Sequence, residues 1–497
     1  MKVHLFYRDR DWSRQECTDL LEQDRFRDLE LSWVVKAMSQ GDPVLEEAAR
    51  LALAEPLTDP GEIRYRQDIL RDFLDCPELL HGLYDICIRA EEQRKNCWYR
   101  LTSPHLSTVY SSGLDLLKIY LQALTELRRA LEEAPEACRS EGLSRLRREL
   151  LEALSDRYLE QVQQLQGSLG ETGGTLISAR FGDYLQGVSY VLRKKETGLS
   201  RLHWLTAPSY TLADRDMNGA KDLEVRRDRA INQAANALAQ AAESLESFVV
   251  QLQWELAFYA GGENLFNRMH SLSMPLCFPE IGGKGRSFHH IYDGSLALKT
   301  ENRVTANDLE AGEKKLFLIT GANQGGKTTF LRALGQCQLM AQAGLPVFAE
   351  QCSIPVCSRI FTHFTREEDR AMGSGKLDEE LDRMSRIADR LCSGSLVLFN
   401  ESFASTNQRE GSELLRQITQ ALLEEHIAVF SVTHLPDYAR SLMDQGDALC
   451  LRAERRPDGV RTYRIQPGKP DGTAFGQDLY RKIFLQPEDC PDSGSDE

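Results

Sequence analysis

The chain has 497 residues, of which 41% are hydrophobic and 27% are charged, and its formal net charge is −15. This length exceeds what one hydrophobic core supports, so two or three domains are expected, and the acidic balance argues against a protein coated in basic surface for nucleic acid. No run approaches 18 uninterrupted apolar residues and the N-terminal apolar stretch is too short for a signal peptide, so we expect a cytoplasmic protein that does not associate with membranes.

The first 300 residues are expected to be almost entirely helical. Polar and apolar residues alternate at the helical period over 11–38 and 44–54, with a Gly-Asp-Pro break between them. Further helices are predicted over about 63–74, 78–96, 112–133 and 140–166. Residues 222–259 contain neither proline nor glycine and therefore predict one long helix, of the kind that serves as a lever or strut.

A short β insertion interrupts this helical region near residues 171–199. Two strands are predicted, over 175–181 and 188–192. Basic residues follow, and a β insertion that carries them at the tip of long helices is what a clamp on a phosphate backbone requires. They are Arg193, Lys194 and Lys195, with Arg226, Arg227 and Arg229 in the long helix. Interleaved acidic residues leave open the alternative that these are solvated faces of an ordinary hairpin and helix.

The chain changes character after residue 260. Glycine and proline recur over 261–310, where we place a loop-rich junction that ends a helical domain over residues 1–260. Residues 311–485 alternate strands with helices, which predicts an α/β domain around a mostly parallel sheet. Residues 486–497 form an acidic tail that composition predicts to be disordered. The twelve cysteines are dispersed without a C-x-x-C pair and are expected to be reduced thiols.

A glycine loop carries the strongest chemical signal. It fits G-x-x-x-x-G-K-[ST] from Gly321 to Thr328, between a predicted strand at 316–319 and a predicted helix. Inward-pointing backbone N–H groups and a helix N-terminus suit a polyphosphate; Lys327 would reach the β- and γ-phosphates and Thr328 would bind Mg²⁺. A glycine-rich turn with a chance lysine is the alternative, which the flanking strand and helix disfavour. The expected nucleotide-binding residues are Gly321, Ala322, Asn323, Gln324, Gly325, Gly326, Lys327, Thr328 and Thr329.

Three polar residues follow two predicted strands of the same sheet. Asn400 and Glu401 end the strand at 396–401 and His434 ends the strand at 427–434, so all three should lie at the ligand-binding edge. Glu401 is predicted to orient or deprotonate the attacking water, and His434 to sense the γ-phosphate, although a lone histidine is often structural. Asn400 stands where an acid would support the metal; its amide oxygen can still accept a hydrogen bond, but without charge we expect weaker Mg²⁺ binding and slower turnover.

Three segments resemble the ATPase domain of the MutS DNA mismatch-repair family, a branch of the ABC-type ATPases. They are the glycine loop, residues 400–407 from the strand end onward, and residues 432–434. The resemblance extends to 463–468, which is similar to the short β segment after that core. Weaker similarity covers 56–59, like the opening of the family's helical lever domain, and the β insertion, which sits where its DNA clamp would. The resemblance, over about residues 20 to 480, implies a P-loop ATPase that binds ATP and Mg²⁺ and forms a head-to-tail homodimer on double-stranded or branched DNA. It also implies a base-stacking role for Tyr292 and a role for Ser374, within the segment 368–376, at the ATP of the partner subunit.

The chain departs from the family pattern at both ends. Its similarity starts near the lever, so we expect neither a mismatch-reading domain with a Phe-x-Glu wedge nor a connector domain, and we expect no nuclease-like extension. We therefore expect an ATP-driven dimer switch coupled to a DNA clamp that does not itself read mismatches. Two alternatives stay open: a nucleotide-dependent scaffold with negligible hydrolysis, which Asn400 favours, and an ABC-like ATPase that acts on a protein partner, which the acidic charge favours.

Overall fold

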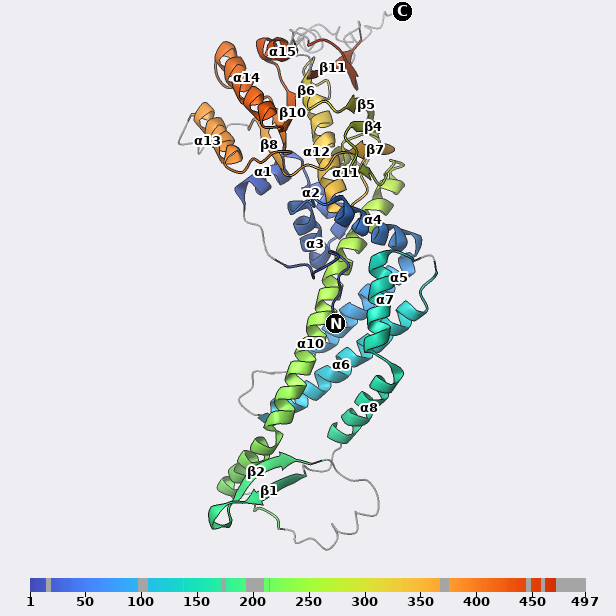
Figure 1. Cartoon of the computed structure of the whole chain (residues 1–497), viewed down its shortest axis with the longest axis vertical. Coiled ribbons are helices and arrows are strands. Elements are labelled where there is room, and N and C mark those ends of the chain that lie inside the picture. Colours follow the sequence, from blue (N-terminus) through green and yellow to red (C-terminus); the bar gives the residue numbers. More distant parts are fainter. Residues whose placement is uncertain are drawn as a thin grey trace, which may run out of the picture. The chain divides into compact units, whose positions relative to one another are not determined.

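The computed structural model describes residues 1–14, 19–96, 106–136, 138–170, 176–193, 210–213, 215–366, 375–443, 448–456 and 461–470. Contacts between residues divide the chain into two compact units, and Figure 1 labels most of their helices and strands. Unit 1 comprises Met1–Trp12 and Arg71–Tyr259, and unit 2 comprises Ser13–Leu70 and Ala260–Glu497. Among the described helices, none is both long and apolar enough to cross a membrane.

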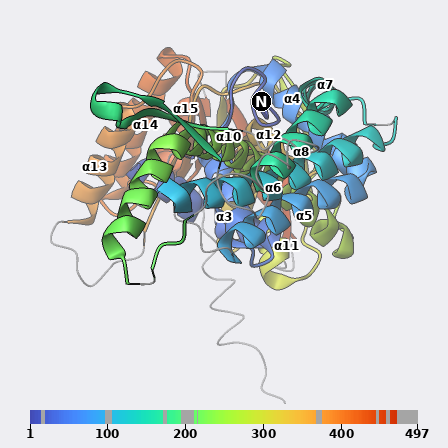
Figure 2. The same cartoon turned by 90° about the horizontal axis from the view of Figure 1, so that it is seen from below.

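Unit 1 is built from long helices. They are α5 (Pro77–Asn96), α6 (Leu106–Glu132), α7 (Glu141–Ala153), α8 (Asp156–Gly170) and the first part of α10 (Met217–Ser271). Helices α5 and α6 lie side by side, and α6 also contacts α7 and α8 (Figure 2). Leu114, Leu117 and Leu121 recur at helical spacing on α6 and pack with Leu238 of α10, so one apolar stripe of α6 faces the core.

The N-terminal residues of unit 1 are held by a buried carboxylate rather than by a helix of their own. Glu255 of α10 is 0% exposed, and its two oxygens accept the backbone N–H groups of Leu5, Phe6 and Trp12 at 2.7, 2.9 and 3.0 Å. The Trp12 ring stacks on Phe6 with centroids 3.6 Å apart. Residues 11–14 are not helical, and the helical stretch expected over 11–38 contains two helices, α1 (Leu20–Asp28) and α2 (Ser32–Ser39), which are separated at Glu30 by a φ of +51°.

The predicted β insertion is present as an antiparallel hairpin. Strands β1 (Ile177–Phe181) and β2 (Gly187–Leu192) pair across a short 3₁₀ turn, η1 (Asp183–Leu185). Phe181, Tyr184 and Leu185 at this turn are 82%, 100% and 80% exposed. Of the basic residues predicted to follow the hairpin, Arg193 is described and exposed, whereas Lys194 and Lys195 lie outside the described residues.

Two further helix predictions need correction. The single helix expected over 140–166 is two helices, because α7 ends at Ala153 and α8 begins at Asp156. Arg128 stabilises the break, since its guanidinium donates to the Leu154 carbonyl at 2.6 Å and to the Asp156 carboxylate at 2.7 Å. Helix α10 extends past the predicted end at 259 to Ser271, through two glycines. A Cβ on Gly262 would lie 3.1 Å from Leu70, so this glycine permits close packing and does not break the helix.

The range 261–310 is also more structured than the predicted loop-rich junction. It contains the end of α10, β3 (Glu280–Ile281), β4 (Arg286–Ile291), α11 (Gly294–Thr300) and the start of β5 (Asn307–Gly312). With β7 (Gln351–Ile354) these strands form a four-stranded mixed sheet in the order β3-β7-β4-β5. Contacts also place residues 13–70 in unit 2, with α2 (Ser32–Ser39), α3 (Pro43–Ala54) and most of α4 (Pro60–Asp75), and not in one helical domain over 1–260.

A six-stranded sheet forms the centre of unit 2, as the predicted α/β class requires. Its order is β12-β11-β6-β10-β9-β8, and only β12 runs antiparallel to its neighbour. The strands are β6 (Leu316–Thr320), β8 (Ile360–Phe364), β9 (Leu396–Asn400), β10 (Ala428–Val432), β11 (Ala448–Arg455) and β12 (Arg461–Pro467). Strand β8 was not predicted from the sequence.

Helices cover both faces of this sheet. Side chains alternate between faces along a strand, so Val397 and Phe399 point one way and Leu398 the other. Val397 and Phe399 share an apolar cluster with α13 (Lys376–Ala388), α14 (Gln408–Glu424) and α15 (Pro436–Met443). Leu398 instead meets Gly335 of α12 (Lys327–Ala343), where an added Cβ would lie 2.7 Å away. The sheet is therefore buried on both sides, and its carboxyl edge is left to carry polar residues.

Candidate nucleotide-binding site

The glycine loop joins β6 to α12, as the sequence predicts. Gly321 and Gly326 have φ of +117° and +90°, which side-chain-bearing residues rarely adopt. A Cβ on Gly321 would also lie 3.0 Å from the Ala453 backbone nitrogen. Gly326 is the N-cap of α12, whose first residue is Lys327, so the loop delivers the chain directly to a helix N-terminus. The positive end of the helix dipole thus lies at the loop, a setting that favours an anion.

The Lys327 side chain turns back over the loop. Its amino group donates to the carbonyl oxygens of Gly321 and Ala322, both at 3.0 Å, and the residue is 5% exposed. Burial lowers the pKa of this amino group to about 8, against the opposing effect of the Glu401 carboxylate. A buried cation whose hydrogen bonds go to carbonyl oxygens is a strong electrostatic partner for an incoming phosphate.

Two oxygens suited to a magnesium shell lie together at the start of α12. The Thr328 hydroxyl donates to the amide oxygen of Asn400 at 2.9 Å, which joins the helix to the end of β9. Hydroxyl and amide oxygens can coordinate a hard cation directly or accept hydrogen bonds from the water molecules that it binds. This pair therefore fits Mg²⁺ with its water shell. Neither group carries charge, and most of the negative charge in such a shell would have to come from phosphate.

Glu401 and His434 are in hydrogen-bonding contact at the same edge. His434 Nε2 lies 2.8 Å from Glu401 Oε1, and their side chains are 26% and 38% exposed. The hydrogen bond from His434 is the main cause of a lowered pKa for the Glu401 carboxyl. Glu401 has a φ of +55°, an uncommon backbone conformation for a residue with a side chain. The carboxylate is thus ionised and oriented by the histidine.

Strand register brings these residues to one place. Val432 of β10 pairs with Ile319 of β6 on one side and with Asn400 of β9 on the other. The Glu401 N–H donates to the Val432 carbonyl at 2.9 Å. Strands β9 and β10 therefore end side by side, and the residues that follow them leave the sheet at the same edge. The three predicted strand-end residues therefore lie beside the glycine loop.

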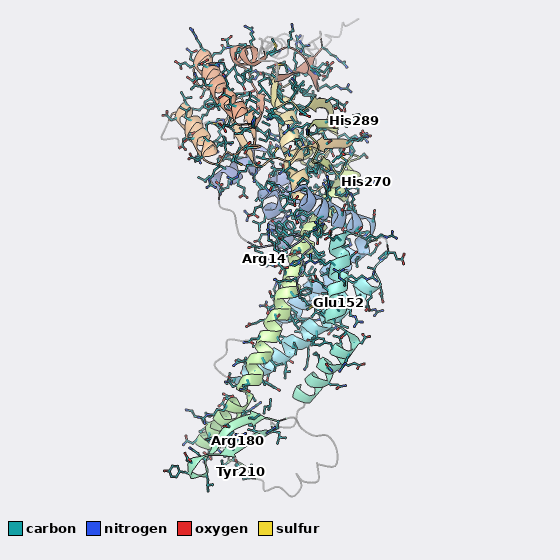
Figure 3. All side chains as sticks on the ribbon, in the orientation of Figure 1. Arg14, Glu152, Arg180, Tyr210, His270 and His289 are labelled. Atoms are coloured by element: carbon teal, nitrogen blue, oxygen red, sulfur yellow. The ribbon has the colours of Figure 1, made fainter. Side chains whose placement is uncertain are left out.

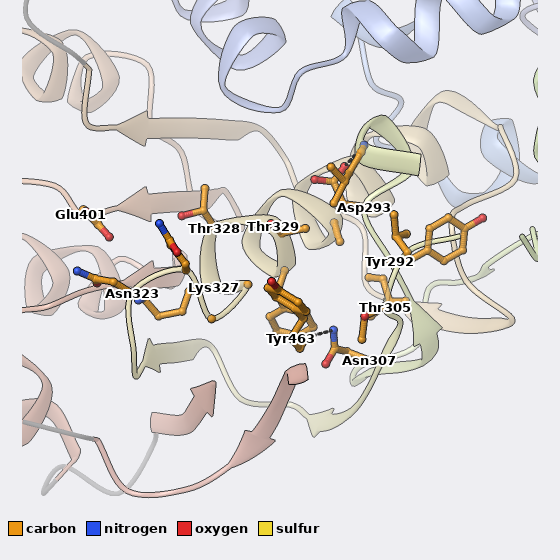
Figure 4. A pocket seen from close by; sticks show the side chains of 18 of the residues that line it. Tyr292, Asp293, Thr305, Asn307, Asn323, Lys327, Thr328, Thr329, Glu401 and Tyr463 are labelled. Atoms are coloured by element: carbon orange, nitrogen blue, oxygen red, sulfur yellow. Dashed lines mark hydrogen bonds between the residues drawn. The ribbon is translucent and has the colours of Figure 1, made fainter. Parts of the chain in front are cut away.

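A cavity of about 660 Å³ opens between the glycine loop and the β4–β5 region (Figure 4). This volume is within the usual range for small-molecule sites, and every residue of its lining belongs to unit 2. The lining comprises Ile291, Tyr292, Asp293, Leu296, Arg303, Val304, Thr305, Asn307, Asn323, Gln324, Gly325, Gly326, Lys327, Thr328, Thr329, Phe330, Ala333, Glu401, His434 and Tyr463.

Tyr463 is a lining residue that sequence reasoning did not single out. The residue is 53% exposed, its φ is +61°, and a Cβ on Gly326 would lie 3.5 Å from its backbone. Asn307 of β5 holds this segment: its amide donates to the Tyr463 carbonyl at 3.5 Å and its oxygen accepts the Ile465 N–H at 2.7 Å. An exposed aromatic ring next to a glycine loop is the signal that could have identified Tyr463, because such rings stack on bases.

The remaining predicted residues take different places. Tyr292 lines the cavity but is only 1% exposed, and its hydroxyl donates to the Pro275 carbonyl at 2.6 Å, so little of its ring surface is available for stacking. Asn323 and Gln324 are exposed at the turn of the loop, Ala322 and Gly325 are buried within it, and Thr329 is half-buried. Ser374 and most of the segment 368–376 lie outside the described residues.

Family comparisons match two parts of the chain. Residues 58–272 match the MutS2 N-terminal domain and residues 317–479 match MutS domain V, an ATPase domain. Endonuclease MutS2 of Streptococcus uberis is 25% identical over 432 residues, which cover 78% of this chain and 51% of that protein. Endonuclease MutS2 of Streptococcus sanguinis is 34% identical over 173 residues, covering 34% and 22% of the two chains. The chain thus spans about half the length of these relatives, or less.

These matches coincide with the site. Domain V begins within β6 and includes the glycine loop, Asn400, Glu401, His434 and Tyr463. On the two domain matches and the likeness over most of the chain, this protein belongs to the MutS family.

Proposed function

We propose that this protein is a Mg²⁺-dependent ATPase of the P-loop, ABC type, in which ATP drives a homodimeric switch coupled to DNA. The observation that carries the proposal is the convergence of two contacts beside the glycine loop. Thr328 touches Asn400 and His434 touches Glu401, at the edge where phosphates would meet the α12 N-terminus.

Each side chain has a distinct role in this proposal. The Lys327 amino group would exchange its two carbonyl acceptors for β- and γ-phosphate oxygens, and the loop N–H groups would bind the remaining charge. Glu401 would hold the attacking water through its ionised carboxylate, with His434 fixing the carboxylate's direction. Bound Mg²⁺ would neutralise charge that develops on the phosphates, held by Thr328 and, through water, by Asn400. The Tyr463 ring would stack on the base.

A nucleotide-dependent scaffold with slow hydrolysis is the second candidate. It is favoured by Asn400, whose neutral amide contacts Thr328 where a carboxylate would add negative charge to the metal shell. In both candidates ATP would act as the link between two ATPase domains, and they differ in how readily hydrolysis releases that link.

DNA is the partner that the family supports, and the hairpin of unit 1 offers a surface for it. Exposed Phe181 and Tyr184 lie at the turn of the hairpin, where Arg180 precedes Phe181, and Arg193 lies at the opposite end, where its N–H donates to the Leu176 carbonyl. Aromatic rings that stack on bases, together with arginines that contact phosphates, form a common nucleic-acid-binding combination. A protein partner is the alternative, favoured by the net charge of −15.

The proposal is tested by the mass of the protein in solution with and without Mg²⁺ and ATP. Glu401→Gln, which should bind ATP without consuming it, is expected to shift from monomer to dimer when ATP is added. Lys327→Ala serves as the matched control and should stay monomeric. A mass that does not respond to ATP in the Glu401→Gln protein would contradict the ATP-driven dimer.

A further inference from the structure

A cluster of two histidines and two carboxylates lies on the four-stranded sheet of unit 2, outside the nucleotide cavity. His289 and His290 are in β4, Asp308 is in β5, and Glu350 immediately precedes β7. Their side chains are between 48% and 63% exposed, and His289 is labelled in Figure 3. None of these four residues has a role in the proposed ATPase mechanism.

A β-bulge puts both imidazoles on the outer face. Phe288 pairs with Leu309 and Ile291 pairs with Asn307, so the two histidines oppose the single residue Asp308. Phe288 and Ile291 are 3% and 0% exposed. In a regular strand, residues at these positions would point to opposite faces; the extra residue lets both enter the core and turns His289 and His290 outward together.

The backbone at the bulge is fixed by this cluster. His290 has a φ of +52°, and its N–H donates to the Asp308 carboxylate at 2.8 Å. The Glu350 N–H donates to the His289 carbonyl at 3.0 Å, which anchors the start of β7 beside β4. The side chains are therefore carried by paired strands and not by a free loop.

Three potential ligand atoms form a triangle of the size that a tetrahedral zinc ion requires. His289 Nε2 is 3.3 Å from His290 Nδ1; Glu350 Oε2 lies 2.9 Å from His290 Nδ1 and 3.8 Å from His289 Nε2. Ligands at the usual zinc distances lie about 3.3 Å apart in a tetrahedron. The three edges lie close to this value without any movement of the backbone.

Asp308 supplies the outer partner that such sites use. Its Oδ1 lies 2.7 Å from His289 Nδ1, so it can accept the proton on that nitrogen and leave the Nε2 lone pair for a metal. We propose that His289 Nε2, His290 Nδ1 and Glu350 bind one Zn²⁺ ion, that Asp308 orients His289, and that the fourth position is open to water or an exogenous ligand. Three protein ligands with one open position distinguish such a site from a closed structural zinc site.

The experiment uses the full chain after treatment with a chelator, without nucleotide or Mg²⁺. Zn²⁺ is titrated in competition with a chromophoric chelator for the wild type and for His289→Ala/His290→Asn. Asparagine is chosen at 290 because it tolerates the positive φ and so preserves the bulge. The double variant should bind one Zn²⁺ fewer per chain, while His270→Ala, which alters another exposed histidine of unit 2, should match the wild type.

Two single variants test the assigned roles. Glu350→Gln and Asp308→Asn should each weaken Zn²⁺ binding by at least about tenfold, the loss typical when a partner of a metal-bound histidine is removed. Co²⁺ provides an optical readout: the wild type should show visible bands of a tetrahedral ion, and the double variant should lose them. If the double variant loses the visible Co²⁺ bands and keeps any near-ultraviolet sulfur-to-cobalt absorption, the ion that is lost was bound by the histidines and not by cysteine thiols.

The proposal is overturned if His289→Ala/His290→Asn binds Zn²⁺ with the stoichiometry and affinity of the wild type. It is also overturned if the Co²⁺ bands are the same in the two proteins. Thermal unfolding of both metal-free proteins provides the check on folding, and because all four side chains are exposed, equal midpoints are expected. A rise in the wild-type midpoint with Zn²⁺, absent from the double variant, would support the site independently.

Discussion

Lys327 should make nucleotide affinity depend on pH. Burial lowers the pKa of its amino group to about 8, and a bound phosphate would raise that pKa by favouring the charged form. Binding above this pH therefore takes up a proton. Affinity for ATP should be level below pH 8 and should fall by about tenfold for each pH unit above it. Calorimetric titration across this range measures the effect; Lys327→Arg should remove the dependence, and a level wild-type profile would contradict the account.

Asn400→Asp should strengthen the magnesium shell. Aspartate keeps an oxygen to accept the Thr328 hydroxyl and adds negative charge, and hydrogen bonds to ionised acceptors are about twice as strong as neutral ones. The Mg²⁺ concentration for half-maximal ATP hydrolysis should fall by about tenfold, and turnover should rise. Asn400→Leu, which removes the acceptor, should have the opposite effect. If neither substitution changes the Mg²⁺ dependence, Asn400 is not part of the metal shell.

The glycine loop and the polar residues at strand ends were the parts of the site that the sequence could predict. Asn400, Glu401 and His434 lie at the ends of short apolar runs that favour buried strands, and parallel strands share a carboxyl edge. Tyr463 could not be placed in this way, because its position depends on a hydrogen bond from Asn307, 156 residues away. Long-range side-chain contacts of this kind leave no periodic trace in the sequence.

Among the elements, the contact between β5 and β12 should control recognition of the base. Asn307→Ala leaves the Ile465 N–H, on a residue only 4% exposed, without its acceptor, a loss of about 1–3 kcal/mol. The Tyr463 segment should then lose its fixed position, and ATP affinity should fall. Inorganic tripolyphosphate, which has no base, should bind Asn307→Ala as it binds the wild type. Equal losses for both ligands would contradict a role in base recognition; Asn307→Asp, which keeps the acceptor, is the matched control.

Helices and strands with a regular pattern of apolar residues were predicted well. Element boundaries that depend on contacts with distant residues were not. The hairpin and strands β6, β9 and β10 follow from apolar runs and turn residues. The break between α7 and α8 is stabilised by Arg128, a residue from another helix. Helix α10 continues through Gly262, where Leu70 packs in the space that a side chain would fill, so this glycine marks close packing and not a helix end. Strand β8 carries Thr362 and His363 in a fully buried strand, where polar residues conceal the apolar pattern.

For the molecule as a whole, binding of DNA should depend on the hairpin of unit 1 despite the net charge of −15. Arg180→Ala should weaken duplex binding and reduce the slope of log affinity against log salt by about 1, because one phosphate contact is lost. Tyr184→Ala should weaken binding without changing that slope. Arg129→Ala removes an exposed arginine of α6 paired with Glu133 and should leave both values unchanged. Identical slopes for Arg180→Ala and the wild type would favour a protein partner over DNA.

The most direct test of the account is steady-state ATP hydrolysis by the purified protein with Mg²⁺, with and without duplex, branched and single-stranded DNA. The account predicts turnover that changes with one DNA form and that falls by at least about a hundredfold in Glu401→Gln, because the carboxylate that holds the water is lost. ATP binding should be retained in that variant. Hydrolysis that persists in Glu401→Gln, or a negligible wild-type rate that no DNA alters, would contradict the switch and leave the scaffold.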